Sequence, residues 1–209
     1  MEAYLIVCPL LFLAGFVDSI AGGGGLISLP AYLLAGLPPH LALGTNKFSS
    51  AMGTTISTVR FALNGFIPVR PALLCVTMAF IGSTIGSRLA LIVSEAVVKN
   101  LMIVVLPVVA FYVLRNKKLS SDAGMVESIP DKRSLLITGA AALFIGCYDG
   151  FYGPGTGTFL LLILTGAAKL GMRTSAGLTK ATNLASNVAA LLTFVLSAKV
   201  YYPLAIAGA

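Results

Sequence analysis

Two lysines of this 209-residue chain stand in otherwise apolar stretches, each in a similar motif. The motifs are Gly44-Thr-Asn46-Lys47 and Gly177-Leu-Thr179-Lys180. An ammonium group in apolar surroundings is costly unless an anion pairs with it. Carrying that cost at two equivalent positions indicates a function, such as holding an anionic substrate. The alternative is that each lysine extends its ammonium to a polar boundary.

A glycine-rich stretch with an aspartate before it precedes each lysine motif. Asp18 precedes the run Gly22-Gly23-Gly24-Gly25, and Asp149 precedes Gly153-Pro-Gly155-Thr156-Gly157. The aspartates are 131 residues apart and the lysines 133 apart, so the chain contains an internal repeat. The aspartates could pair with the lysines or carry protons that drive transport; a structural ion pair is the alternative.

Two asparagines extend the second lysine motif. Asn183 and Asn187 are spaced to share one helix face with Lys180. In the first half, Ser49, Ser50 and Thr54 lie close to the corresponding face. Such polar faces could line a path or form hydrogen bonds between helices.

The composition places these residues in a membrane protein. Hydrophobic residues make up 57% of the chain and charged residues 10%, whereas soluble domains carry about 25% charged residues. The chain has a net charge of +7, and its basic residues are scattered or lie in loops beside apolar segments. This distribution follows the positive-inside rule and argues against nucleic-acid binding. The three cysteines are isolated and there is one histidine, so neither a metal nor another cofactor is expected. No residue set suggests catalysis, so we expect no enzyme.

Apolar runs and turn residues predict an all-α polytopic fold with broken helices at the glycine runs. The expected helical segments are 3–20, 26–35, 44–64, 71–93, 96–114, 134–152, 157–165 and 176–197. Within 71–93, Gly82 and Gly86 form a small-residue motif that either packs against another helix or arises by chance in a glycine-rich chain.

The segments divide into two membrane repeats, 1–114 and 134–209, and the second is expected to be incomplete at its C-terminus. The polar linker 115–133 contains five Lys or Arg residues, which predicts a cytoplasmic position. By alternation from this linker, the two repeats run through the membrane in opposite directions. Inverted-topology repeats of this kind are frequent in secondary transporters.

The glycine runs predict an anion site between the repeats. Unwound backbone inside a membrane is tolerated only where it lines a cavity or a ligand site. A helix that starts after such a run directs its N-terminal N–H groups, with partial positive charge, at that site. The alternative is that the glycines serve helix packing alone. A nucleotide-binding loop is excluded, because no Gly-Lys-Ser/Thr follows at the required spacing.

These motifs resemble the sulfite exporter TauE/SafE family of membrane transporters. The resemblance rests on Gly22–Pro30 and Gly44–Lys47 in the first half and on Gly153–Phe159 and Gly177–Asn187 in the second. Two departures are a run of four glycines where five is common, and Leu178 where Thr is frequent. The resemblance implies transport of small sulfur-containing anions such as sulfite or organosulfonates.

We therefore expect a secondary transporter in the cell membrane that moves a small sulfur-containing anion by alternating access. A passive anion channel or a non-transporting membrane scaffold is the alternative. The expected partners are the small anion and the lipid bilayer, with proton coupling through Asp18 or Asp149; oligomeric state stays open. The candidate substrate-binding residues are Gly22, Gly23, Gly24, Gly25, Asn46, Lys47, Gly153, Gly155, Thr156, Gly157, Thr179, Lys180, Asn183 and Asn187.

Overall fold

The computed structural model describes residues 2–21, 24–115 and 131–209, and these ranges are helical with short connections. Gly22, Gly23 and residues 116–130 of the expected linker lie outside the described residues. The α-helices are α1 (Glu2–Ala21), α2 (Gly25–Leu34), α3 (Pro39–Leu63), α4 (Val69–Ile92), α5 (Glu95–Arg115), α6 (Lys132–Phe151), α7 (Thr156–Leu162), α8 (Met172–Leu196) and α9 (Tyr202–Ala207). A π-helical turn, Ile163–Ala167, continues α7.

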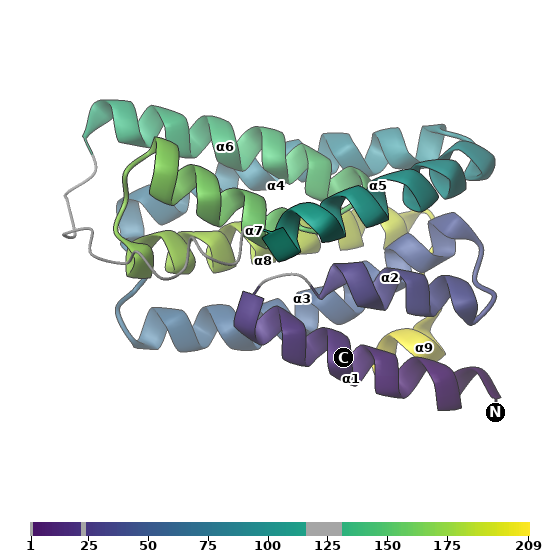
Figure 1. Cartoon of the computed structure of the whole chain (residues 1–209). Coiled ribbons are helices and arrows are strands. Elements are labelled where there is room, and N and C mark those ends of the chain that lie inside the picture. Colours follow the sequence, from purple (N-terminus) through teal and green to yellow (C-terminus); the bar gives the residue numbers. More distant parts are fainter. Residues whose placement is uncertain (1, 22–23, 116–130) are drawn as a thin grey trace.

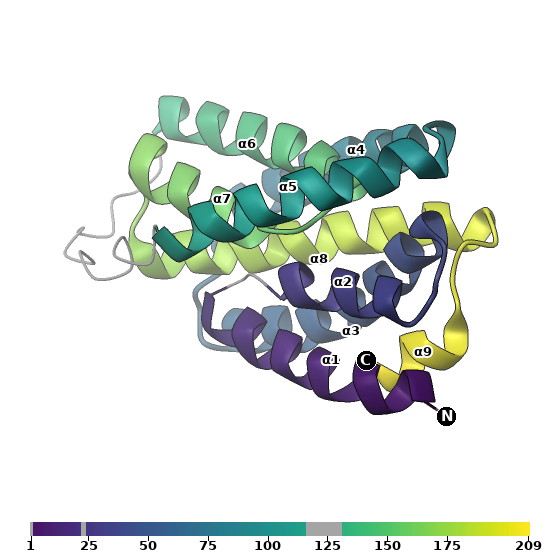
Figure 2. The ribbon, with the colours of Figure 1, turned by 45° about the vertical axis from the view of Figure 1, so that its right-hand side comes forward.

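The two longest helices, α3 and α8, pack together in the middle of the molecule (Figure 1). Figures 1 and 2 show them crossing the fold in opposite directions. In both views α1 and α6 also run oppositely, as do the short helices α2 and α7. The helix α8 additionally contacts α4, α6 and α7, so it packs against helices from both halves of the sequence.

Both long helices begin earlier than the sequence pattern predicted. The helix α3 starts at Pro39 instead of Gly44, and α8 starts at Met172 instead of Ala176. Proline suits the first helical turn, where its missing N–H would have had no partner. As a result Lys47 and Lys180 each occupy the ninth position of a 25-residue helix, roughly 12 Å from its start. Both lysines therefore lie well inside their helices rather than at the ends.

Glycines allow α4 and α6 to approach closely. A Cβ added at Gly86 would collide with the backbone of Cys147, and one at Gly82 with the backbone of Leu143. Reciprocally, a Cβ at Gly150 would collide with the backbone of Ser83. Of the two interpretations of Gly82 and Gly86, packing against another helix is the one that holds, because a side chain larger than hydrogen would separate the helices. This contact fixes the end of α6 that carries Asp149.

Apolar side chains cover much of the outside, whereas many polar ones are buried. Phe12, Ile92 and Leu196 are at least 80% exposed, while Lys47 and Asn187 are buried. Among the described residues, three helical stretches are long and apolar enough to cross a membrane: Val69–Ile92, Glu95–Tyr112 and Lys132–Phe151. A surface of this kind is favourable against lipid and unfavourable against water. The fold is therefore that of a polytopic membrane protein.

Candidate functional site

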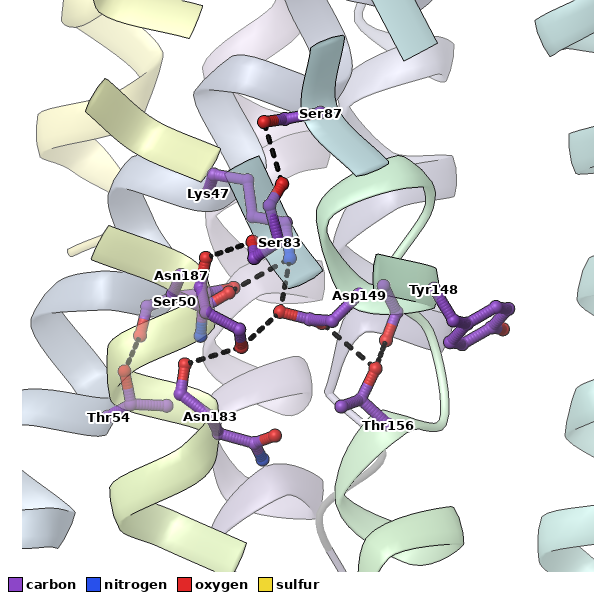
Figure 3. A network of polar contacts seen from close by, with 12 residues as sticks. Lys47, Ser50, Thr54, Ser83, Ser87, Tyr148, Asp149, Thr156, Asn183 and Asn187 are labelled. Carbon is purple, nitrogen blue, oxygen red and sulfur yellow. Dashed lines mark hydrogen bonds and ion pairs between the residues drawn. The ribbon is translucent and has the colours of Figure 1, made fainter. Parts of the chain in front are cut away.

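A buried ion pair between α3 and α6 forms the centre of the site. The Nζ of Lys47 lies 2.8 Å from the Oδ2 of Asp149, and the two side chains are 2% and 6% exposed. The same Nζ donates a hydrogen bond of 3.0 Å to the Oδ1 of Asn187 on α8. Figure 3 shows the lysine reaching both partners. Three helices thus meet at one ammonium group.

Two hydroxyl groups complete the surroundings of the Asp149 carboxylate, and Figure 3 labels the one that belongs to Thr156. The Oγ1 of Thr156, the first residue of α7, donates to Oδ1 at 2.9 Å. The Oγ of Ser186 on α8 donates to Oδ2 at 2.6 Å. A buried carboxylate needs such donors as well as its cation, since a charge without partners is strongly unfavourable in an apolar interior.

The connection between α6 and α7 has the shape that its glycines permit. Gly153 and Gly155 adopt φ values of +102° and +85°, which L-residues rarely adopt. Two freed carbonyl groups have side-chain hydroxyls at 2.6 Å: Tyr148 donates to the oxygen of Pro154, and Thr156 donates its one hydrogen either to the oxygen of Gly153 or to Asp149. An added Cβ at Gly153 would lie 3.2 Å from the Nζ of Lys47. Glycine at this position therefore leaves room for the ammonium group.

A second, looser ion pair links α8 to α1. The Nζ of Lys180 lies 3.9 Å from the Oδ2 of Asp18, and these side chains are 12% and 38% exposed. The Oδ1 of Asp18 accepts a hydrogen bond of 3.1 Å from the backbone N–H of Gly24, next to the start of α2. The carboxylate thus occupies the position at this helix N-terminus where the sequence predicted a substrate anion.

A small polar cavity of about 40 Å³ lies between the two aspartates. A space of this size suits water or a small ion, since drug-sized ligands occupy pockets of roughly 300–1,000 Å³. Ser50 and Thr54 of α3, two of the three residues whose polar face was predicted to line a path or to bond between helices, also contribute to the wall. The predicted residues that line the cavity are Asp18, Gly25, Asn46, Lys47, Asp149, Gly153, Gly155, Thr156, Gly157, Asn183 and Asn187.

Three predicted residues within the described part of the chain do not line this cavity. Lys180 reaches it only through Asp18, and Gly24 only through its N–H bond to the same carboxylate. The hydroxyl of Thr179 is buried without a hydrogen-bond partner among the described residues. Gly22 and Gly23 lie outside the described residues.

The ammonium groups of Lys47 and Lys180 lie too far along their helices to be repelled by the positive end of the helix dipole. The dipole effect falls off within the first turn, whereas each lysine is the ninth residue of its helix. The anion that each ammonium requires is instead supplied by an aspartate of the chain itself.

Sequence reasoning missed two serines that support the site. Ser186 binds the Asp149 carboxylate, and the Oγ of Ser28 donates to the Oδ1 of Asn46 at 2.6 Å. Ser186 could have been found, because it lies three residues after Asn183 on the same polar face. No spacing rule points to Ser28, since its contact depends on how α2 packs against α3.

A polytopic helical protein with a charged, polar cavity at its centre belongs to the class of membrane transport proteins. Comparison with known proteins places it more narrowly. A sequence model described as "Sulfite exporter TauE/SafE" matches residues 7–209. The chain therefore belongs to the sulfite exporter TauE/SafE family, and it is a membrane transporter, not an enzyme.

Individual relatives agree with this assignment. The "Probable membrane transporter protein ORF9" of Sinorhizobium sp is 37% identical over 92% of this chain and 72% of its own length. The "Probable membrane transporter protein YfcA" of Escherichia coli K12 is 32% identical over 91% of this chain and 69% of its own length. The "Sulfite exporter TauE/SafE family protein 6" of Arabidopsis thaliana is 37% identical over 36% of this chain and 18% of its own. No solved structure matches the chain.

Proposed function

We propose that this protein is a secondary transporter of small sulfur-containing anions such as sulfite or a sulfonate. The observation that carries the proposal is the buried Lys47 ammonium, which lines a small polar cavity between helices of both halves. A single ammonium with amide and hydroxyl neighbours suits an oxyanion, because it offers a charge and several hydrogen-bond donors or acceptors. The family supplies the expectation of sulfur.

Alternating access between two inverted repeats, 1–114 and 134–209, is the mechanism we propose. It is supported by the opposite directions of α1 and α6, of α2 and α7, and of α3 and α8 (Figures 1 and 2). The connections that follow α1 and α6 are interpreted as breaks in membrane helices, each next to one aspartate. Both ion pairs cross between the repeats, so relative motion of the repeats would alter them.

We further propose that the protein resides in the cell membrane with the 115–133 linker on the cytoplasmic side. The support is the cluster of Lys and Arg residues in that linker. Protease cleavage of a site inserted into the linker tests this orientation: cleavage in inside-out vesicles alone agrees with it, and cleavage in right-side-out vesicles alone contradicts it.

Uptake of labelled sulfite, thiosulfate or methanesulfonate into proteoliposomes tests the transport function. We expect saturable uptake by the wild type and loss of uptake in Lys47→Ala. The matched control is Lys99→Ala, which removes an exposed lysine on α5 outside the cavity and should keep uptake. Uptake that never saturates would indicate a passive anion channel, and no flux of any of the three anions would contradict transport of this class.

A further inference from the structure

The charged side chains at the cavity are already paired with one another, so a substrate anion that binds there must alter an ion pair of the chain. Lys47 already has an anion, Asp149, at 2.8 Å, and Lys180 has Asp18 at 3.9 Å. Among the described cavity-lining residues, Lys47 is the cation, and Asp18 and Asp149 are the acidic groups. An incoming anion therefore meets an ammonium whose charge is already compensated. It can bind there only if the Asp149 carboxylate gives up its place or its charge.

We propose that Asp149 takes up one proton each time a substrate anion replaces its carboxylate at the Lys47 ammonium, so that anion and proton move together. This inference rests on the proposed function. Before binding, the ammonium pairs with the carboxylate. After binding, it pairs with the substrate, and a new O–H bond on Asp149 removes the second negative charge. For a monovalent anion the exchange leaves the charge of the site unchanged.

The hydrogen-bond partners of Asp149 suit both of its protonation states. They are the hydroxyls of Thr156 and Ser186, and a hydroxyl can donate to a carboxylate or accept from a carboxylic acid by rotating its hydrogen. A protonated carboxyl also provides a hydrogen-bond donor, and the wall of the cavity offers an acceptor for it. The Oδ1 of Asn183, which lines the cavity, is buried without a partner among the described residues.

Asp18 is not the carboxylate that an incoming anion displaces. Its cation, Lys180, lies 3.9 Å away and does not line the cavity. Its Oδ1 keeps the hydrogen bond from the backbone N–H of Gly24 in either protonation state of Oδ2. The groups that could otherwise influence Asp149 are Lys180, already paired with Asp18, and Tyr148, whose hydroxyl is bonded to Pro154. The geometry therefore favours Asp149 over Asp18 as the proton carrier.

Calorimetric titration of the solubilised full chain with methanesulfonate tests the coupling directly. A sulfonate does not titrate near neutral pH, so any proton uptake belongs to the protein. We expect about one proton taken up per anion, and a Kd that rises about tenfold per pH unit. Repeating the titration in buffers of different ionisation enthalpy measures the proton count. A wild-type Kd that does not change with pH would overturn the inference while leaving anion binding intact.

Two variants locate the proton. In Asp149→Asn we expect binding with no proton uptake and a Kd independent of pH. The matched control is Asp131→Asn, because Asp131 caps α6 away from the cavity and asparagine caps a helix equally well. A pH dependence retained in Asp149→Asn, or lost only in Asp18→Asn, would overturn the assignment. If Asp149→Asn does not fold, the titration of Asp18→Asn decides: one proton still taken up per anion agrees with the assignment, and no proton uptake overturns it. Failure of the wild type to bind methanesulfonate, sulfite or thiosulfate would instead overturn the proposed function.

Discussion

Replacing Lys47 with methionine should destabilise the protein far more than replacing Lys47 and Asp149 together. Methionine matches the length of lysine but leaves the Asp149 carboxylate buried without a cation. At the observed 2.8 Å and an effective dielectric constant of about 20, two unit charges attract by roughly 6 kcal/mol. Desolvation of both ions offsets part of this attraction, so breaking the pair from one side should cost about 3–5 kcal/mol.

The double variant Lys47→Met/Asp149→Asn should recover most of that loss. It leaves no buried charge: the asparagine Oδ1 can accept from one of the hydroxyls of Thr156 and Ser186, and its Nδ2 can donate to the other. The main remaining defect is the Oδ1 of Asn187, which loses its donor at a cost of about 1–3 kcal/mol. We therefore expect the double variant to be more stable than Lys47→Met by about 2 kcal/mol, yet equally inactive in transport.

Thiol labelling during denaturant unfolding in detergent micelles measures these differences. Cys75 is buried, so a thiol-reactive dye reports its exposure on unfolding in a background in which the other two cysteines, Cys8 and Cys147, are replaced by alanine. The exposed lysine Lys99 provides the control, because Lys99→Met should change the unfolding free energy by less than about 0.5 kcal/mol. A cost below about 1 kcal/mol for Lys47→Met, or a double variant no more stable than that single one, would refute the assignment of a buried ion pair.

Two pairs of glycine substitutions separate packing from function. Gly86→Ala should lower the free energy of unfolding by about 1–3 kcal/mol, since its Cβ would meet the α6 backbone. Gly53→Ala should raise it by about 0.5–1 kcal/mol, because nothing lies within 4 Å of the added Cβ. Equal unfolding midpoints for the two variants would contradict the close packing of α4 against α6. Gly153→Ala and Gly36→Ala both strain a positive φ, but only the first places a Cβ 3.2 Å from the Lys47 ammonium. Anion uptake per folded molecule should fall in Gly153→Ala alone; equal uptake in the two would argue against a role for this contact.

The helices and the composition of the cavity could be predicted from the sequence because they depend on local patterns. Proline and glycine mark the ends of the segments. The repeated motifs identified Lys47 and Asp149, and helical spacing from Lys180 identified Asn187. The starts of α3 and α8 were placed four or five residues too late. The pattern of apolar residues weakens at these ends, while helical geometry continues through the first turn.

The partners of each charged group could not be predicted, because spacing along the chain does not say which helices meet. Asp18 was as plausible a partner for Lys47 as for Lys180. The packing of α3 against α8 decides the matter, and it brings Lys47 to the end of α6 rather than to the end of α1. The hydrogen bond between Ser28 and Asn46 could not be predicted for the same reason, because it depends on the packing of α2 against α3.

The crossed pairing explains why neither half could assemble this site alone. Each lysine finds its aspartate in the other half of the sequence, and the pairs differ in tightness, 2.8 Å and buried against 3.9 Å and partly exposed. A buried pair contributes little stability compared with well-packed apolar residues, which would avoid desolvating two charges. In a chain with only 10% charged residues, keeping both pairs is therefore hard to attribute to folding. Their position beside the polar cavity instead favours a role in handling ions.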